Sequence, residues 1–190
     1  MTTTDKHSMK LIQDRHISAL LNPRPVVLVT CCDEHYVPNV LSVAWQTPLS
    51  HNPPLVGISI DSHHYSHELI VKTGEFVINI VPQEFKSAIE FCGNQSGRDL
   101  DKFAAAGIVI QPAHCVHPPL IQGALGHIEC AVENSIPTGD HTFFVGRVLY
   151  AEADSASFNN SWQPDQGDVI LCVQRDQFGK WSLSEFQLRL

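Results

Sequence analysis

The sequence predicts a mainly β fold, in which an antiparallel barrel carries a few packed helices. Strand-like runs outnumber helical ones, and the turns between them are short. Closing the strands into a barrel hides edges that would otherwise stay unpaired. The length of 190 residues fits one domain, and a hydrophobic share of 43% with 17% charged residues is typical of a globular chain. We expect one domain over 1–190, with 1–9 as a flexible tail.

Strands are expected wherever the sequence shows an apolar or an alternating run. They lie at 26–30, 39–45, 55–60, 75–81, 127–133, 141–151, 169–174 and 180–183. The first is a β-branched run, which is typical of a buried strand. In 127–133 apolar and polar residues alternate, which predicts a half-buried strand with His127 and Glu129 on the face opposite the apolar side chains. Trp45 ends the second strand and is expected to be a core residue.

Helices are expected at 14–21, 65–72, 83–92 and 99–105. Pro23 ends the first helix because proline cannot continue one. Ser62 is the expected N-cap of the second helix and Gly74 its stop, while Gly107 closes the fourth.

Composition excludes several classes of protein. The formal net charge is −8, and an acidic domain repels nucleic-acid phosphates, so we expect no nucleic-acid partner. No apolar run approaches the ~20 residues of a membrane span, and residues 1–10 lack an apolar signal core. We therefore expect a soluble, cytoplasmic protein with no membrane contact. The six cysteines form no CxxC pair and are expected to be reduced, mostly buried thiols.

The most unusual cluster is a group of three histidines and a serine where a strand meets a helix. It consists of His63, His64, Ser66 and His67. A helix N-terminus with hydroxyl and imidazole donors suits a phosphate. His63 and His67 also have metal-ligand spacing, although the zinc-protease pattern HExxH lacks its second histidine here. A phosphate site, a metal site and a solvated polar loop therefore all remain open for this cluster.

Further candidates lie along the chain, each with an ordinary structural alternative. Arg98 and Lys102 follow a glycine-flanked loop at 93–97 and suit either an anionic ligand or a solvated helix cap. His141 opens a strand after a glycine and an aspartate, and a lone histidine is usually structural. The run 114–117 has metal-capable side chains but only two histidines and one thiol. No nucleophile elbow and no glycine-rich phosphate loop of the P-loop or dinucleotide type is present.

Six short motifs occur in an order that resembles a known family. They are PRPVVLVT (23–30), NVLS (39–42), NPPLV (52–56), TGEFVIN (73–79), SGRDLDKF (96–103) and GDH (139–141). Together they resemble the flavin reductase-like, FMN-binding split-barrel family, and within it the flavoredoxin group. The resemblance covers about residues 15–152, and it rests on the order of the pieces rather than on any single one.

The resemblance implies a split antiparallel barrel of Greek-key type that forms a homodimer with FMN at the subunit interface. It places the backbone of 39–42 along the flavin, the His63–Ser66 junction at the phosphate, and His141 near the reactive flavin edge. His141 is the expected catalytic side chain, and no metal ligand is expected. The expected cofactor-binding residues are Thr30, Asn39, Val40, Leu41, Ser42, Ser59, His63, His64, Tyr65, Ser66, Arg98 and Lys102.

The function favoured at this point is an NAD(P)H-dependent flavin reductase. The flavin carries the redox chemistry, and NAD(P)H is the expected electron donor because it can stack on an exposed flavin face. Three alternatives stay open. They are a flavoredoxin-like carrier with a protein electron partner, a non-catalytic FMN-binding or sensing module, and a metal-binding protein that uses its histidine-rich loops.

Overall fold

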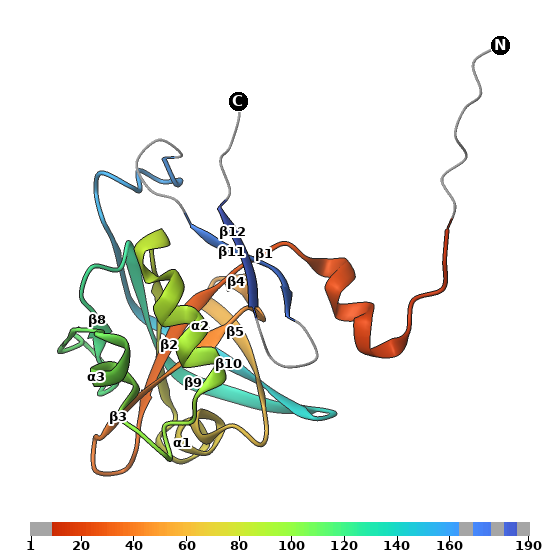
Figure 1. The fold of residues 1–190 in the computed structure, drawn as a ribbon. Coiled ribbons are helices and arrows are strands. Elements are labelled where there is room, and N and C mark those ends of the chain that lie inside the picture. Colours follow the sequence, from red (N-terminus) through yellow and green to blue (C-terminus); the bar gives the residue numbers. More distant parts are fainter. Residues whose placement is uncertain (1–8, 164–168, 176–180, 186–190) are drawn as a thin grey trace.

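A seven-stranded antiparallel sheet dominates the computed structural model, which describes residues 9–163, 169–175 and 181–185 (Figure 1). The strand order is β3-β2-β6-β9-β10-β5-β4. The strands are β2 (Val27–Cys32), β3 (Pro38–Val43), β4 (Gln46–His51), β5 (Pro54–Asp61), β6 (Glu75–Ile80), β9 (Gly126–Thr138) and β10 (His141–Ala153). The predicted mainly β class is confirmed, while the predicted tail lies outside the described residues except for Met9.

The sheet curls into a split barrel because of a short connection. β3 and β4 lie at opposite edges of the sheet, yet only Ala44 and Trp45 separate them in the chain. A flat sheet of this size would hold its edges roughly 29 Å apart at about 4.8 Å per strand, whereas this connection spans at most roughly 11 Å. The amide of Ser59 donates to the carbonyl oxygen of Trp45 at 2.8 Å. Among the described strands no ladder joins β3 to β5, so the barrel stays split there, as predicted.

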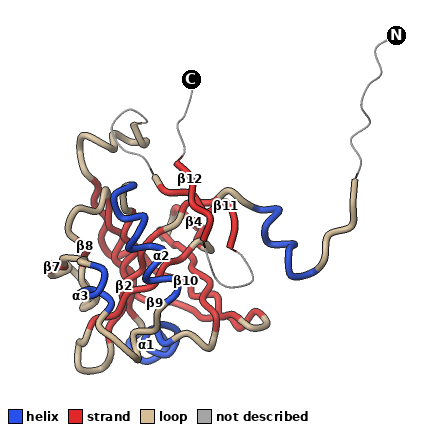
Figure 2. The backbone as a smooth tube through the Cα atoms, in the orientation of Figure 1, coloured by secondary structure: helices blue, strands red, loops and turns tan. Residues whose placement is uncertain are grey.

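Apolar residues fill the barrel and also cover one outer face. Inside, Val29, Leu41 and Phe144 pack with Leu69 and Ile70 of α1 (Tyr65–Thr73), which closes one end of the barrel. Outside, α2 (Lys86–Asn94) and α3 (Lys102–Ala106) cover the sheet face that carries Leu28 and Val40 (Figure 2). This arrangement leaves the split between β3 and β5 at the boundary of the two cores.

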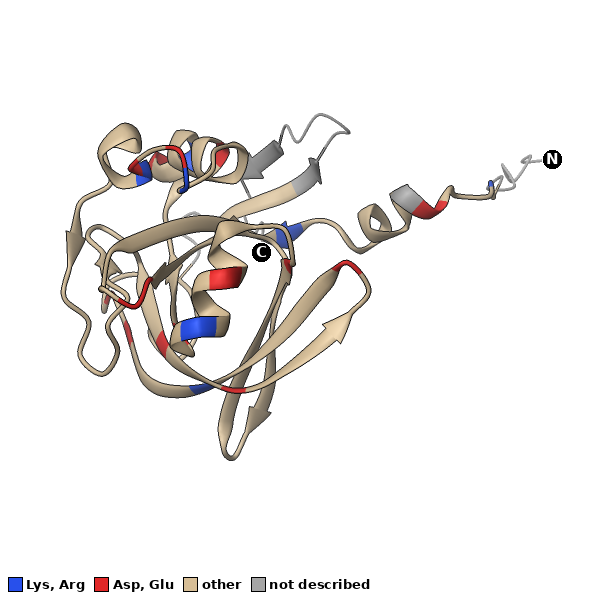
Figure 3. Cartoon of the chain, turned by 90° about the horizontal axis from the view of Figure 1, so that it is seen from below, with Lys and Arg blue, Asp and Glu red and all other residues tan. Residues whose placement is uncertain are grey.

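Short elements complete the described chain. They are the 3-10 helices η1 (Asp14–Leu21) and η2 (Gln83–Phe85), the sheet of β1 (Arg24–Pro25), β11 (Ile170–Arg175) and β12 (Trp181–Glu185), and the pair β7 (Ile110–Gln111) and β8 (Leu120–Ile121). η1 extends away from the body of the molecule (Figure 2). Acidic and basic positions are scattered over the described residues rather than gathered on one face (Figure 3). None of the described helices has the length and apolar character needed to cross a membrane.

Several element boundaries differ from the sequence prediction. Residues 14–21 form a 3-10 helix, and the helix expected at 83–92 is divided into η2 and α2. The helix expected at 99–105 begins at Lys102, because the Asp101 carboxylate caps it by accepting from two backbone amides. β4 was not expected, since its polar residues and Pro48 lack a strand pattern.

Other differences concern single side chains. Ser62 is not a cap: His64 occupies the N-cap position of α1, and Ser62 donates to Asp140 instead. His127 and Glu129, expected on the open face of their strand, are 7% and 0% exposed. The segment 113–121 covers that face, and the Glu129 carboxylate accepts from the backbone amides of His114 and Cys115 at 2.9 and 2.6 Å.

Gly146 offers a test of this packing, because β10 lies against the ring of Phe76 at this residue and glycine has no side chain to fill the contact. A Cβ at Gly146 would lie 2.5 Å from Cζ of Phe76 and 3.0 Å from Cβ of Cys130. We expect Gly146→Ala to lower the free energy of unfolding by about 1–3 kcal/mol through overpacking. Urea unfolding measures this, with the exposed Leu149→Ala on the same strand as the control, expected within about 0.5 kcal/mol of wild type. An unchanged midpoint for Gly146→Ala would contradict the packing.

Candidate functional site

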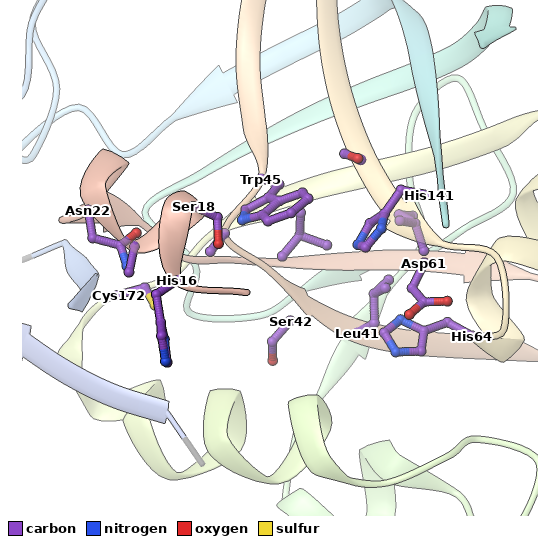
Figure 4. Close-up of a pocket in the computed structure, with 15 residues that line it drawn as sticks. His16, Ser18, Asn22, Leu41, Ser42, Trp45, Asp61, His64, His141 and Cys172 are labelled. Atoms are coloured by element: carbon purple, nitrogen blue, oxygen red, sulfur yellow. The ribbon is translucent and has the colours of Figure 1, made fainter. Parts of the chain in front are cut away.

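Two adjoining cavities lie along the split in the barrel. The first has a volume of about 390 Å³ and the second about 370 Å³. They share Leu41, Ser42 and His64, so they lie next to each other. In the first cavity, side chains of η1 and Cys172 gather at one end and His141, Asp61 and His64 at the other (Figure 4).

The first cavity lies where β3 and β5 diverge. Leu41 and Ile60 give it apolar walls, and Ser42 and Ser59 add hydroxyl groups. Trp45 was expected in the core, but it is 39% exposed and lines this cavity. Its position explains the difference, because the chain leaves the ladder with β2 before Trp45 and joins β5 after it. The cavity therefore combines apolar and aromatic side chains with polar groups, a lining that suits an aromatic ligand with polar edges.

His141 is held in a defined orientation at the first residue of β10. Its Nδ1 lies 2.6 Å from the Asp140 carboxylate, and its ring stacks on Trp45 with centroids 4.8 Å apart and planes 25° apart. Gly139 has a φ of 75°, a conformation that glycine adopts without strain and that forms the tight turn before this strand. With Nδ1 bound to Asp140, the Nε2 atom is the one left to face a ligand in the first cavity.

The second cavity has the character of an anion site. The N-terminus of α1, the positive end of the helix dipole, forms part of its lining. Lys102 also lines this cavity; it is 5% exposed, and its Nζ donates to the carbonyl oxygens of Cys92 and Gln95, both at 3.3 Å. Burial lowers the pKa of Lys102 from its usual value. A helix N-terminus and a buried amine together favour a phosphate or another small anion.

Asp61 connects the two cavities electrostatically. Its Oδ1 accepts from the backbone amide of His63 at 2.9 Å and faces Nδ1 of the same residue at 2.8 Å. Burial raises the pKa of Asp61, but the hydrogen bonds from His63 and the nearby His64 and His141 outweigh it, so the net shift is downward. The carboxylate therefore stays charged at neutral pH beside imidazoles from both cavities.

Arg98 has a bracing role next to the second cavity. Its guanidinium lies 2.6 Å from the Glu68 carboxylate and 4.7 Å from the centroid of the Tyr65 ring. Gly97 lets the same loop pass against Asn39, because a Cβ at this position would collide with the Asn39 amide. Arg98 thus fixes the loop to α1 rather than lining either cavity.

The structure brings most of the predicted site residues together. Those that line the two cavities are Leu41, Ser42, Ser59, His63, His64, Tyr65, Ser66, Lys102 and His141. Those that line neither cavity are Thr30, Asn39, Val40 and Arg98. Asn39 still supports the site, because its amide donates to the hydroxyl of the nearly buried Ser66 at 2.7 Å. Thr30 is buried and donates to the Pro119 carbonyl at 2.6 Å, and Val40 packs beneath α2.

Sequence reasoning missed several residues of the site. Trp45 was assigned to the core, and Asp61 was given no role, whereas Asp140 was expected as the acidic neighbour that orients the His141 ring. Asp61 carried a weak signal, since an aspartate directly after a buried strand and before three histidines stands next to any site they form. The contribution of η1, through residues such as His16 and Asn22, had no signal in the sequence.

Thiol and metal chemistry find little support in the described residues. Five of the six cysteines are buried and Cys115 is exposed, as expected. Burial raises the pKa of Cys31 to about 12 and that of Cys92 to about 11, so these thiols stay protonated and unreactive. Within the described ranges, no group of three or more His, Cys, Asp or Glu side chains could hold a metal ion. The histidine cluster therefore lacks the geometry of a metal site there.

The chain belongs to the Flavin reductase like domain family, whose sequence profile matches residues 20–182. Among relatives, an uncharacterized protein of Archaeoglobus fulgidus is 34% identical over 60% of this chain and 64% of its own length. The uncharacterized protein YddH of Escherichia coli is 34% identical over 81% of this chain and 84% of its own. An NADH-dependent flavin reductase of Rhodococcus is 34% identical over 65% of each chain. The match to this chain thus covers less than two thirds of the length of the archaeal relative and of the Rhodococcus relative.

Solved structures share the fold over nearly the whole chain. Flavoredoxin from Methanosarcina acetivorans has a TM-score of 0.81 at 21% identity and covers 95% of this chain and 92% of its own. An FMN-binding protein from Thermus thermophilus with bound p-hydroxybenzaldehyde has a TM-score of 0.76 at 26% identity, covering 97% and 95%. These similarities confirm the flavin reductase-like fold that the motif order indicated.

Proposed function

We propose that this protein binds FMN across the two cavities and acts as an NAD(P)H-dependent flavin reductase. The observation that carries the proposal is that a cavity with apolar, aromatic and polar walls adjoins a cavity suited to an anion. FMN has the same two parts, a planar ring system and a terminal phosphate joined by a polar chain. The Rhodococcus relative, an NADH-dependent flavin reductase, supports the choice of reaction.

The residues present fit FMN along the whole site. The edges of β3 and β5 offer backbone groups to a ring in the first cavity, because no ladder joins these strands there. Ser42 and His64, which line both cavities, suit the polar chain between ring and phosphate. The α1 amides, Ser66 and Lys102 suit the phosphate.

When bound, FMN supplies the hydride and electron chemistry. The protein then contributes orientation, exclusion of water and electrostatics. Leu41, Ile60 and Trp45 keep water from one side of the first cavity. His141 offers Nε2 as a hydrogen-bond donor or a cation to negative charge that develops on a ligand in the same cavity. Asp140 holds Nδ1 of His141, which fixes the orientation of the ring.

The absorbance spectrum tests the proposed function directly. Purified protein incubated with FMN and desalted is expected to keep the bands of an oxidised flavin, and these bands should bleach on anaerobic addition of NADH or NADPH. His141→Gln should retain FMN but bleach more slowly, by up to about 10²–10³-fold, if an electrostatic donor is lost. Protein that never retains or binds FMN would overturn the proposal. Retained FMN that neither nucleotide reduces would instead favour the electron carrier or the sensing module.

The phosphate assignment predicts a selective effect of Lys102. Lys102→Met should lower the affinity for FMN by roughly 10- to 100-fold, the scale of one charge-assisted hydrogen bond. The affinity for riboflavin should barely change. Isothermal titration with both flavins measures this selectivity. Arg98→Met is the matched control, because Arg98 pairs with Glu68 outside the cavity. This variant should lower the affinity for FMN by less than about threefold. Equal losses of both flavins in Lys102→Met would show that the amine does not face the phosphate.

We also propose that the protein is a homodimer whose interface includes η1. This helix exposes Ile17, Leu20 and Leu21 by 52%, 67% and 68%, and the neighbouring Leu11 is 99% exposed. An apolar stretch of this kind beside a ligand cavity marks a protein interface. Light scattering should give twice the chain mass of 21.1 kDa, and the double variant Leu20→Glu with Leu21→Glu should give monomers. A wild-type monomer that binds FMN at micromolar concentration would contradict this proposal.

A further inference from the structure

Ser62 joins the two ends of the site through one backbone atom. Both its amide and its hydroxyl donate to the carbonyl oxygen of Asp140, each at 3.0 Å. Ser62 belongs to the turn 61–64 between β5 and α1, which presents His63 and His64 to the second cavity. Asp140 belongs to the turn between β9 and β10, and its carboxylate holds His141 at 2.6 Å. A single residue therefore links the anion-binding turn to the residue that orients His141.

A second contact keeps these turns in register. Asp61 lies directly opposite His141 in the ladder between β5 and β10, where opposed side chains are close neighbours. The Asp61 carboxylate binds the amide and ring of His63, and its carbonyl oxygen accepts from the amide of His64 at 3.0 Å. The turn 61–64 therefore has its own internal hydrogen bonds and is positioned as a unit. Where that unit meets the β9–β10 turn, Ser62 donates two hydrogen bonds to Asp140.

We propose that Ser62 is a positioning residue that couples phosphate binding in the second cavity to the orientation of His141 in the first. The proposal rests on the proposed function, since it assigns the phosphate to the second cavity and a redox role to His141. A phosphate that binds His64 and the α1 N-terminus fixes the turn 61–64. Ser62 transmits this constraint to Asp140, and Asp140 holds the His141 ring. Binding energy from a non-reacting part of the ligand then improves geometry at the reacting end.

The coupling predicts that FMN is reduced faster than riboflavin even when both saturate the protein. Riboflavin has the same ring but no phosphate, so it adds no contact that would hold the turn 61–64 further. We expect a ratio of roughly two- to fivefold, the scale of one net hydrogen bond. Stopped-flow reduction by NADH or NADPH at saturating flavin measures the ratio without interference from affinity.

Variants at position 62 separate the coupling from a general structural effect. Ser62→Ala removes the hydroxyl bond to Asp140 but keeps the amide bond, so it should lower the FMN-to-riboflavin ratio toward one by slowing only the reduction of FMN, whereas Ser62→Thr keeps the hydroxyl and should keep the ratio. Thr138→Ala is the matched control: it removes another hydroxyl of the β9–β10 turn, which bonds the carbonyl oxygen of His141 at 3.2 Å and not the turn 61–64. It should keep the ratio as well. In His141→Gln the two flavins should be reduced at about the same rate, because this variant removes the residue being positioned.

The outcomes distinguish this proposal from the proposed function. Wild-type protein that reduces both flavins at equal rates, or Ser62→Ala with the wild-type ratio, would overturn the coupling while leaving the flavin reductase intact. Equal slowing of both flavins in Ser62→Ala would also overturn it, since that result indicates a merely structural residue. Wild-type protein that binds and reduces no flavin would overturn the proposed function and the coupling together.

Discussion

The connection through Ala44 and Trp45 is the constraint on which the rest of the structure depends. It places one continuous stretch of chain at both edges of the sheet, so the sheet has to curl until the edges approach. The same stretch pairs with β2 before the connection and with β5 after it. It cannot pair with both along its whole length, and the slot that remains between β3 and β5 is the first cavity. Closure and binding site thus have one geometric origin.

The two cavities differ in the physical means that define them. The first lies between two strand edges and is lined by apolar and aromatic side chains together with histidines, serines and Asp61. The second relies on helix amides and on the buried amine of Lys102, whose lowered pKa records the cost of desolvating it. The described hydrogen bonds of this amine go to the carbonyl oxygens of Cys92 and Gln95. An anionic ligand beside it would lower the electrostatic energy of the buried charge. The site is therefore most favourable when both cavities are filled by one molecule.

Sequence patterns predicted most strands, the helix after the histidine cluster and most cavity-lining residues, because periodicity and motif order are local signals. They failed where tertiary contacts decide. Arg98 and Lys102 are four residues apart and chemically alike, but Glu68 draws the first away from the cavity while helix packing buries the second beside it. Glu129 is buried because a distant loop supplies amide donors to its carboxylate. No window of sequence around these residues contains that information.

Residues 38–51 pair with β2 through β3 and with β5 through β4. This has a consequence for how related sequences can vary in length. Side chains in a strand alternate between faces, so one inserted or deleted residue reverses every side chain beyond it. An insertion at Ala44 would need compensation against β5 while leaving the β2 register intact. In the β9–β10 turn, Gly139 lies between the paired residues Thr138 and His141, so a residue inserted there can lengthen the turn without shifting the register of either strand. Length variation among descendants of this fold should therefore collect in the hairpin turns and avoid the crossing strand.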